Sequence, residues 1–427
     1  MRAMKDSGIA WIGEIPEEWK VSTIKREYHF QTGWTPDTTH EDYFLGGNIW
    51  VNISDLKSAT TYDSEKHISN EAVQSSSMNI SPKGSLMYAF KLSVGAVSFC
   101  GRDMYTNEAI ATFLPGKNSL RFLYYMAPIF IIKNANENIY GAKLLNQRLI
   151  RNAKIIIPPI AEQERIADYL DRKCSQIDAI IARQQEVIEK LKAYKLSVIT
   201  EAVTKGLNPH APMKDSGVEW IGKVPEQWKV AKLKFVASFY NGDRSSKYPS
   251  GTDIVDEGVI FVTSNNLGNT FLDTTISTKY ITKEKYDDLG GAKIRINDII
   301  FCLRGSVGKC SINKSENEGT IASSLVVIRA KKILADYLIF ALQCPGITAV
   351  STLNAIGIGS LNLSADDISE IFIPIPPEKE AAEIAEFLYK RIGKIDHVIN
   401  EKNNYVNHFV MYKKSLIYEV VTGKKEV

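Results

Sequence analysis

The sequence predicts an α+β fold: two similar domains in tandem duplication, separated by two long antiparallel coiled-coil helices with approximate two-fold symmetry. Two internal repeats support this prediction. Residues 4–21 return as residues 213–230 with 13 of 18 positions identical, at an offset of 209. A long helical pattern at residues 158–206 returns at residues 376–423 with the same apolar spacing of about seven residues. The chain therefore repeats one order of elements: short segment, globular body, long helix.

The composition is that of an ordinary globular protein. The 427 residues are 44% hydrophobic and 24% charged, which is enough for two or three domains. No apolar run exceeds about eight residues and the start lacks the apolar core of a signal peptide, so we expect a cytoplasmic protein without membrane contact. The five cysteines are never spaced as CxxC, so we expect reduced packing residues rather than disulfides or a zinc site. A net charge of +3 does not by itself indicate a nucleic-acid partner.

We call the repeated short segments, residues 4–21 and 213–230, the straps. They contain four of the six tryptophans, Trp11, Trp19, Trp220 and Trp228, together with recurring glycines and prolines. A Pro-x-x-Trp pattern with glycines favours an irregular, well-packed segment. We expect these tryptophans to anchor the straps on an adjacent helix or sheet rather than to stack on nucleic-acid bases.

Each globular body contains patterns typical of short strands followed by a helix. In the first body we predict strands within residues 48–56 and 85–101, a helix at 120–132 and a closing strand at 154–157. The second body has the matching segments 259–267, 298–309, 333–342 and 371–375. Mixed strands and helices of this kind form a small α+β domain.

These patterns predict four parts. They are a first domain at 1–157, a first long helix at 158–206, a second domain at 207–375, and a second long helix with the C-terminal tail at 376–427. The repeat offset grows from 209 at the straps to 218 at the helices, so the second body is nine residues longer. The two halves therefore have the same order of elements, while the residues of the two globular bodies differ.

Each long helix has the expected start and stop signals, with two prolines before it, acidic residues in its first turn and Gly206 or Gly423 after it. We predict helices of about 44 residues whose apolar stripes bury each other. Gln184 and Lys402 interrupt the stripes at equivalent positions, and an ordinary amphipathic core helix is the alternative. The predicted stripes are Ile177, Ile180, Val187, Leu191, Tyr194 and Val198 in the first helix, and Ile395, Val398, Tyr405, Phe409, Tyr412 and Leu416 in the second.

Polar and glycine-rich loops interrupt the strands in both bodies. Their side chains include the donors and acceptors that recognise base edges in a major groove. For each residue taken singly, an ordinary solvated loop position is the alternative. The candidates are Thr35, Asn52, Lys91, Ser93, Arg102 and Asn107 in the first body, and Arg244, Asn265, Asn266, Arg304, Ser306 and Lys309 in the second.

Motifs of catalysis are missing from the sequence. There is no phosphate-binding loop, no G-x-G-x-x-G and no H-E-x-x-H, and the six histidines have no metal-ligand spacing. Asn208 and Pro209 are followed by His210 and Ala211, which departs from the Asn-Pro-Pro-Tyr pocket of adenine methyltransferases. The sequence therefore predicts neither a catalytic residue nor a cofactor or metal site in this chain.

The duplicated straps, the segment DIIFCLRGSVGK and the prolines that precede IAEQERIADYLD together resemble the specificity (S) subunit of type I restriction-modification systems. The resemblance covers essentially the whole chain. The loop pattern of that family, Arg-x-Gly-Ser-x-Gly or a near variant, is carried by Arg304, Ser306 and Gly308. The first body matches more loosely, with Lys91 and Ser93, and with Ser85 where the second body has Asp298.

The resemblance implies two target-recognition domains, each binding one half of a bipartite site in double-stranded DNA. The helix pair would set the spacing and dock the methyltransferase subunits, expected to be two. Those subunits would bind S-adenosylmethionine and flip out an adenine, and restriction subunits would use ATP and Mg²⁺. Two different bodies could enter the major groove roughly 34 Å apart or somewhat more, with Lys25, Lys83 and Lys285 on phosphates.

Two other classes of function remain as alternatives. A protein-binding scaffold, with two peptide-recognition domains on a coiled coil, would show no salt-dependent DNA binding. A nuclease or methyltransferase that acts alone would cut or methylate DNA as a purified single chain.

Overall fold

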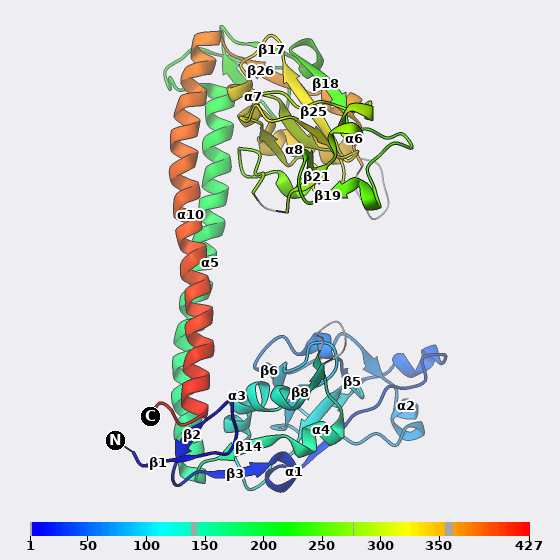
Figure 1. Cartoon of the computed structure of the whole chain (residues 1–427), viewed down its shortest axis with the longest axis vertical. Coiled ribbons are helices and arrows are strands. Elements are labelled where there is room, and N and C mark those ends of the chain that lie inside the picture. Colours follow the sequence, from blue (N-terminus) through cyan, green and yellow to red (C-terminus); the bar gives the residue numbers. More distant parts are fainter. Residues whose placement is uncertain (1, 138–142, 276, 355–361) are drawn as a thin grey trace. The chain divides into compact units, whose positions relative to one another are not determined.

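The computed structural model describes residues 2–137, 143–275, 277–354 and 362–427. The chain divides into two compact units: the first is Met1–Arg183 with Tyr405–Val427, and the second is Gln184–Asn404. Each unit holds one α+β body and part of each long helix (Figure 1). The units thus cut across the long helices, whereas the predicted domains end where these helices begin.

The first unit begins with its strap and ends with the last part of the second long helix. Its described strands are β1 (Met4–Asp6), β2 (Glu14–Pro16), β3 (Lys20–Thr23), β4 (Phe30–Thr32), β5 (Asn48–Val51), β6 (Thr60–Thr61), β7 (His67–Ile68), β8 (Leu86–Ala89), β9 (Val97–Cys100), β10 (Tyr105–Thr106), β11 (Ile110–Phe113), β12 (Asn136–Glu137), β13 (Lys143–Leu144) and β14 (Lys154–Ile157). Its described short helices are α1 (Ile24–Glu27), η1 (Glu41–Phe44), η2 (Ile53–Asp55), α2 (Asn70–Ser75), α3 (Leu120–Phe130), η3 (Ile132–Asn134) and α4 (Gln147–Asn152).

The first body is built on a five-stranded sheet of order β4-β11-β8-β9-β6 and a three-stranded sheet of order β10-β5-β7. Strands β8 and β11 are buried along their whole length, which explains their continuous apolar sequence. The closing strand β14 pairs antiparallel with β3. The core extends from these sheets to α3 and on to Ile166 and Leu170 of the first long helix, and to Leu416 and Val420 of the second.

The second unit repeats this arrangement. Its described strands are β15 (Met213–Asp215), β16 (Lys223–Pro225), β17 (Lys229–Lys232), β18 (Ala237–Asn241), β19 (Ile254–Val255), β20 (Val259–Val262), β21 (Lys279–Ile281), β22 (Ile299–Cys302), β23 (Cys310–Ile312), β24 (Gly319–Ile321), β25 (Leu325–Ala330) and β26 (Phe372–Ile375). Its described short helices are η4 (Leu233–Phe235), η5 (Gly251–Asp253), η6 (Ser264–Asn266), α6 (Lys283–Asp288), α7 (Ala335–Leu342), α8 (Pro345–Asn354) and α9 (Ala365–Ser369).

The two main sheets of the second body have four strands each, in the orders β18-β25-β22-β23 and β19-β21-β20-β24. The series β18-β25-β22-β23 corresponds to β4-β11-β8-β9, and β24-β20-β21 corresponds to β10-β5-β7, while β6 and β19 each add a strand in one body only. The corresponding pairs β5 with β10 and β20 with β24 are both parallel. The predicted duplication of an α+β body is therefore confirmed.

The predicted strands are longer than the observed ones. The segments 48–56 and 259–267 are strands only as far as Val51 and Val262, because Asn52 and Thr263 then form capping boxes that start the short helices η2 and η6. The segments 85–101 and 298–309 are predicted to hold short strands ending at glycine turns, and each contains a strand, β8 or β22, and a glycine-containing loop. The antiparallel partner after the loop is β9 in the first body and β23, which begins at residue 310, in the second.

The straps are anchored through their tryptophans, as predicted. Trp19 is buried and its indole Nε1 donates a hydrogen bond to Glu162 Oε2 at 2.9 Å. Trp228 is also buried and donates in the same way to Glu380 Oε2 at 2.9 Å. In the first unit the strap also contacts the C-terminal part of the second long helix, where the Tyr418 hydroxyl donates to the Trp11 carbonyl at 3.0 Å.

The long helices are α5 (Ile160–Lys205) and α10 (Glu378–Val421), of 46 and 44 residues. The prolines at 158–159 and 376–377 precede them, as predicted. Gly206 and Gly423 follow the two helices with φ of 74° and 73°. These left-handed conformations end helices and favour glycine, so the predicted stops are confirmed.

The predicted seam of the long helices is half right. In the first predicted row Ile177, Ile395 and Leu416 are buried, whereas Leu191, Val198 and Phe409 are only half-buried. In the second row Ile180 and Tyr194 are 39% and 44% exposed, and the buried residues are Ile188 and Ile199, which directly follow Val187 and Val198. The error arises because apolar residues stand side by side, as at 180–181 and 187–188, so spacing alone does not select the buried member. The second helix shows the same shift, with Val398, Tyr405 and Tyr412 exposed, and Ile392 and Ile399 buried.

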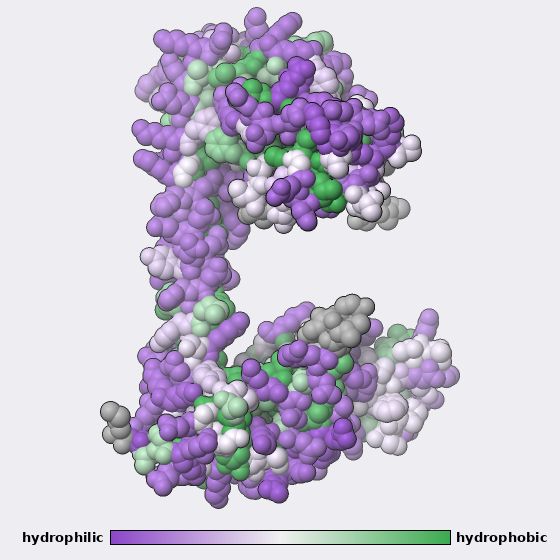
Figure 2. Space-filling view, in the orientation of Figure 1, coloured by the Kyte–Doolittle hydropathy of each residue, from purple (hydrophilic) through white to green (hydrophobic). Residues whose placement is uncertain are grey.

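The described residues lack two features of other protein classes. None of the helices there is long and apolar enough to cross a membrane. The same residues hold no group of three or more His, Cys, Asp or Glu side chains that could bind a metal ion. All five cysteines are unpaired and buried, as predicted, and burial raises the pKa of the Cys100 thiol to about 12. Hydrophilic side chains cover much of the visible face of each unit (Figure 2).

Candidate nucleic-acid interface

In the first body, two candidate asparagines meet where two parallel strands end. Asn52 follows β5 and Asn107 follows β10, and the Asn107 backbone N–H donates to the Val51 carbonyl at 3.0 Å. The Asn107 side-chain amide donates to Asn52 Oδ1 at 3.2 Å. Because β5 and β10 run in the same direction, both amides lie at the carboxyl edge of this sheet.

Two further candidates, Lys91 and Thr35, contact the carboxylate of Glu108, the residue that follows Asn107. Sequence reasoning did not identify Glu108. Lys91 follows β8, and its Nζ lies 3.6 Å from Glu108 Oε1. The Thr35 hydroxyl donates to the other oxygen of Glu108. We call these five residues, Thr35, Asn52, Lys91, Asn107 and Glu108, the first edge cluster. The cluster contains hydrogen-bond donors, acceptors and one ion pair. Each of its five residues is half-buried or exposed.

The ionisation of Glu108 is set by its neighbours. Partial burial alone would raise its pKa, but the hydrogen bond from Thr35 and the positive charge of Lys91 outweigh burial and lower the pKa. Glu108 therefore carries a full negative charge at neutral pH. A charged acceptor is thus held among donors at this edge.

Gly33 brings the Thr35 loop against β10. A Cβ atom at position 33 would lie 1.7 Å from the Thr106 carbonyl oxygen, so only glycine fits there. The next residue, Trp34, donates its backbone N–H to that carbonyl at 2.9 Å, and its side chain is 58% exposed. An exposed tryptophan beside polar loops is a surface on which a sugar or base could stack. The sequence showed the tryptophan but not its exposure.

The structure does not gather all first-body candidates. Ser93 is exposed in the loop between β8 and β9, close along the chain to Lys91. Arg102 is exposed in the turn after β9, at the opposite end of that strand from the Lys91 loop. Strand β9 alone spans roughly 13 Å, so Arg102 lies apart from the first edge cluster.

The second body has a corresponding edge. Strands β18 and β22 are both antiparallel to β25, so they run in the same direction and end at one edge. Arg244 and Arg304 follow these ends and are exposed. Lys309 Nζ donates to the Ser264 carbonyl at 3.5 Å, which links this loop to exposed Asn265. We call the candidates at this edge, Arg244, Asn265, Arg304, Ser306 and Lys309, the second edge cluster.

Asn266 has a structural role that the sequence did not indicate. Its side chain is fully buried, and its Oδ1 accepts from the backbone N–H of Thr263 at 2.9 Å. Its amide donates to the Asp273 carbonyl and to Thr278 Oγ1, both at 3.2 Å. An enclosed amide with these partners holds its own loop together, so we do not include Asn266 among surface contacts.

The difference between Ser85 and Asp298 lies away from the edges. Asp298 is buried before β22, and both its oxygens accept from Arg329 of β25 at 2.7 Å. Arg304 follows the other end of β22. The first body has Ser85 in place of Asp298 and therefore lacks this structural ion pair. The difference does not alter the equivalence of Lys91 and Arg304.

A basic cavity of about 860 Å³ adjoins Arg244. Two of its cations are paired: Lys247 with Asp288, and Arg329 with Asp298. The three lysines predicted to contact phosphate do not line this cavity. Lys25 donates to Asn152 Oδ1 at 3.0 Å, Lys285 pairs with Asp253 at 3.1 Å, and Lys83 precedes β8, at the opposite end from Lys91. The cavity residues with positive charge are Arg244, Lys247, Lys293, Arg295 and Arg329.

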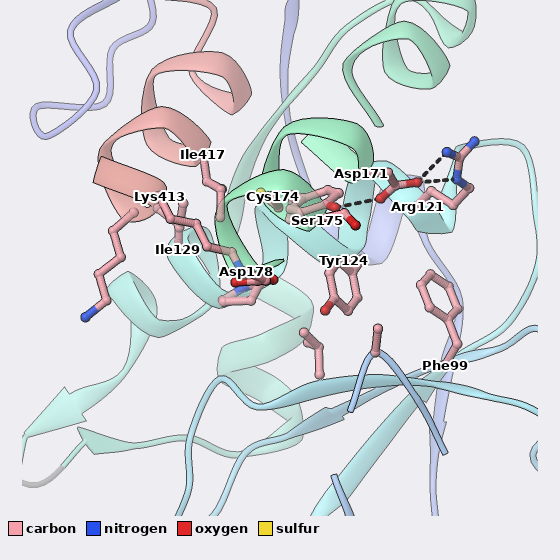
Figure 3. A pocket seen from close by; sticks show the side chains of 15 residues that line it. Phe99, Arg121, Tyr124, Ile129, Asp171, Cys174, Ser175, Asp178, Lys413 and Ile417 are labelled. Carbon is pink, nitrogen blue, oxygen red and sulfur yellow. Dashed lines mark hydrogen bonds and ion pairs between the residues drawn. The ribbon is translucent and has the colours of Figure 1, made fainter. Parts of the chain in front are cut away.

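The units differ in a groove beside the long helices. In the first unit an apolar groove of about 850 Å³ lies between α3, β9 and the helices α5 and α10, with Tyr124 and Cys174 on its walls (Figure 3). In the second unit Phe271 occupies the corresponding region and stacks on Tyr389 of α10, with ring centroids 5.5 Å apart. The groove contains no predicted recognition residue.

A family model described as the type I restriction modification DNA specificity domain matches residues 16–190 and 225–408. The chain belongs to this family. Each matched segment contains one edge cluster, so the protein carries two copies of the specificity domain, one in each globular body.

Curated relatives and a solved structure agree with this assignment. The chain is 27% identical over 427 residues to the type I restriction enzyme MjaVIII specificity subunit of Methanocaldococcus jannaschii, covering 97% of this chain and 94% of the relative. It is 24% identical over 360 residues to the EcoBI specificity subunit of Escherichia coli, covering 80% and 75%. A structure reported for complex assembly and conformational transition of the type I R-M system shares the fold, with a TM-score of 0.69, 14% identity and coverage of 96% and 99%.

Proposed function

We propose that this specificity protein recognises an asymmetric bipartite DNA target, with each domain contacting one half-site in the major groove. The observation that carries the proposal is the pair of edge clusters. They follow corresponding strands of a duplicated fold but present different side chains, such as Lys91 in one domain and Arg304 in the other. A common frame with different contacts suits two half-sites of different sequence.

The side chains at both edges suit base recognition. Arginine and lysine donate to the O6 and N7 acceptors of guanine, asparagine pairs with adenine, and carboxylates accept from cytosine N4. The exposed Arg304, with glycine at 305 and 308, stands on a loop whose backbone could approach a groove closely. The basic cavity beside Arg244 would position the DNA backbone, while the edges specify the bases.

Catalysis is assigned to partner subunits in this proposal. The long helices would set the distance between half-sites and dock two methyltransferase subunits that bind S-adenosylmethionine. Restriction subunits that use ATP and Mg²⁺ would complete a cutting assembly. The family membership of the chain supports this division of labour, because the specificity domain is duplicated across most of its length.

Mapping of modified adenines in cells with and without this chain tests the proposal. We expect one bipartite motif to lose its methylation when the chain is absent. Exchanging residues 233–371, between β17 and β26, for the corresponding body of another specificity protein should change one half of the motif and keep the other. Unchanged methylation in both experiments would refute the proposed function.

A further inference from the structure

Glu108 of the first domain and Ser323 of the second occupy equivalent places in the duplicated fold. Lys91 and Arg304 are equivalent in the same way, since each is the second residue after its strand, β8 or β22. Two matching pairs of backbone hydrogen bonds establish the equivalence. The residue before Glu108 donates to the last residue of β5 (Asn107 N to Val51 O, 3.0 Å), as the residue before Ser323 donates to the last residue of β20 (Ala322 N to Val262 O, 2.8 Å). The residue before Lys91 donates to the residue after Glu108 (Phe90 N to Ala109 O, 3.0 Å), as the residue before Arg304 donates to the residue after Ser323 (Leu303 N to Ser324 O, 2.8 Å).

The two edges differ in charge at three equivalent positions. In the first domain these positions hold Thr35, Lys91 and Glu108, which is one cation and one anion. In the second domain they hold Arg244, Arg304 and Ser323, which is two cations and no anion. The nearby Asp243 is buried and its two oxygens accept from Ser245 and from the Gly290 backbone, so this carboxylate is not presented to a groove.

Glu108 keeps free acceptor capacity. Its side chain is 44% exposed, Lys91 faces one oxygen and Thr35 donates to the other. A carboxylate offers about four lone-pair sites, so two neighbours leave room for a further donor. A negative charge is repelled by phosphates and by the guanine acceptors, so near DNA it is stable only opposite an amino group.

We propose that Glu108 determines specificity in the first half-site by accepting a hydrogen bond from the exocyclic amino group of a cytosine or adenine. Lys91 and Thr35 act as positioning residues that hold the carboxylate toward the groove. In the second half-site Arg304 faces a guanine instead, because the three equivalent positions there hold two cations and no carboxylate. This inference rests on the proposed function and adds to it the class of base that each domain selects.

The experiment uses the complete methyltransferase complex and the mapped target sequence. Binding is measured by competition with DNAs in which one adenine at a time is replaced by purine, or one cytosine by 2-pyrimidinone, which removes only the amino group. We expect one such DNA, altered in the half-site that does not respond to Arg304 variants, to bind the wild-type complex at least about tenfold more weakly.

Variants of this chain link that amino group to Glu108. Glu108→Ala should make the complex indifferent to loss of the amino group, and Glu108→Gln, which keeps an acceptor oxygen, should restore part of the discrimination. Ser323→Glu is the matched change in the other domain. It should pair with Arg304 and weaken recognition of the second half-site only.

Two results would overturn the inference. One is that no amino-group deletion in that half-site affects wild-type binding. The other is that Glu108→Ala lowers affinity equally for every DNA, which would make Glu108 only a tether for its loop. A wild-type complex without any sequence preference would instead refute the proposed function itself, and with it this inference.

Discussion

At the scale of single residues, the two domains present different side chains at equivalent positions. Arg304 is exposed after β22, and Leu303 and Leu363 join the backbone at its loop through a hydrogen bond of 3.0 Å. The guanidinium is therefore presented from a fixed backbone while its own donors face outward. Lys91 stands at the same position in the first domain, but its charge is shared with Glu108 at 3.6 Å.

Replacement of Arg304 by alanine should affect one half-site only. Loss of a bidentate contact to guanine would reduce discrimination at one base pair by about 1–3 kcal/mol. Methylation of target libraries randomised at each position measures this effect. Lys91→Ala is the matched control and should alter the other half-site. Equal loss at both half-sites would contradict the assignment of Arg304.

Glu162 should make the stability of the first unit dependent on pH. Burial alone would raise its pKa, but the bonds from Arg2 and Trp19 outweigh burial and lower the pKa. A carboxylate with a lowered folded-state pKa stabilises the fold above its unfolded pKa, near 4.3, and loses this effect as pH falls through the folded value. Glu162→Gln should therefore cost about 1–3 kcal/mol near neutral pH.

Urea unfolding, followed by tryptophan fluorescence, checks this expectation. The difference in unfolding free energy between wild type and Glu162→Gln should be constant from pH 6 to 8 and shrink below about pH 4.3. The control is Glu17→Gln, which removes an exposed carboxylate from the strap that contains Trp19. It should have little effect on the unfolding free energy at any pH. A difference that does not change with pH would contradict the argument.

At the scale of elements, the long helices are held by apolar seams with a few ion pairs. In the second unit Lys195 of α5 pairs with Asp396 of α10 at 2.8 Å, with side chains only 13% and 19% exposed. In the first unit Lys413 of α10 pairs with Asp178 of α5, whose side chain is 56% exposed. Both pairs join antiparallel helices, but only the first is shielded from water.

Asp396→Asn should therefore destabilise the second unit by on the order of 1–3 kcal/mol, because Lys195 would be left partly buried without its counter-charge. Asp178→Asn removes the equivalent exposed charge and should cost less than about 1 kcal/mol. Hydrogen exchange of the helix amides can separate the two effects by unit. Equal losses would show that burial does not decide the strength of these pairs.

A lengthened helix pair should change the spacing between half-sites. Seven residues inserted at Gln184 and seven at the equivalent Lys402 would keep the heptad seam in register. At 1.5 Å per residue the insertions add roughly 10 Å to each helix, so the preferred spacer should grow by about three base pairs. A library of targets with different spacers measures the change. Retention of the original spacer would refute the role of the helices in spacing.

Sequence patterns predicted the long elements better than the site. The prolines and glycines around α5 and α10 fixed both ends closely, because these residues act through their own backbone preferences. The second seam row failed at Ile180 and Val187, where neighbouring apolar residues made the choice depend on tertiary packing. Glu108 was missed because its partners, Thr35 and Lys91, are distant in sequence and meet it only through the pairing of β11 with β4 and β8. Asn266 was included because its burial could not be foreseen from a polar loop.

At the scale of the whole molecule, the two units share the same strap contacts, while inserted residues change the surface of the second body. The Trp19 bond to Glu162 and the Trp228 bond to Glu380 have the same length of 2.9 Å. The Phe271 loop, by contrast, belongs to the longer second body, and the cavity that Phe271 and Tyr389 line there is about 420 Å³, against about 850 Å³ for the groove of the first unit. Because the anchoring contacts are repeated while the loops differ, we expect that one domain can be exchanged without disturbing the other.

The strap of the first unit lies against the last turns of α10, where Tyr418 bonds to Trp11 and a Cβ at Gly423 would touch Pro16. In the second unit the strap lies against Gly206 in the same manner, but there the chain is continuous from α5. The first strap therefore lies beside the end of α10, as the second strap lies beside the end of α5. A circular permutant, with a short linker from Val427 to residue 2 and new termini between residues 207 and 212, should fold and retain the same DNA specificity.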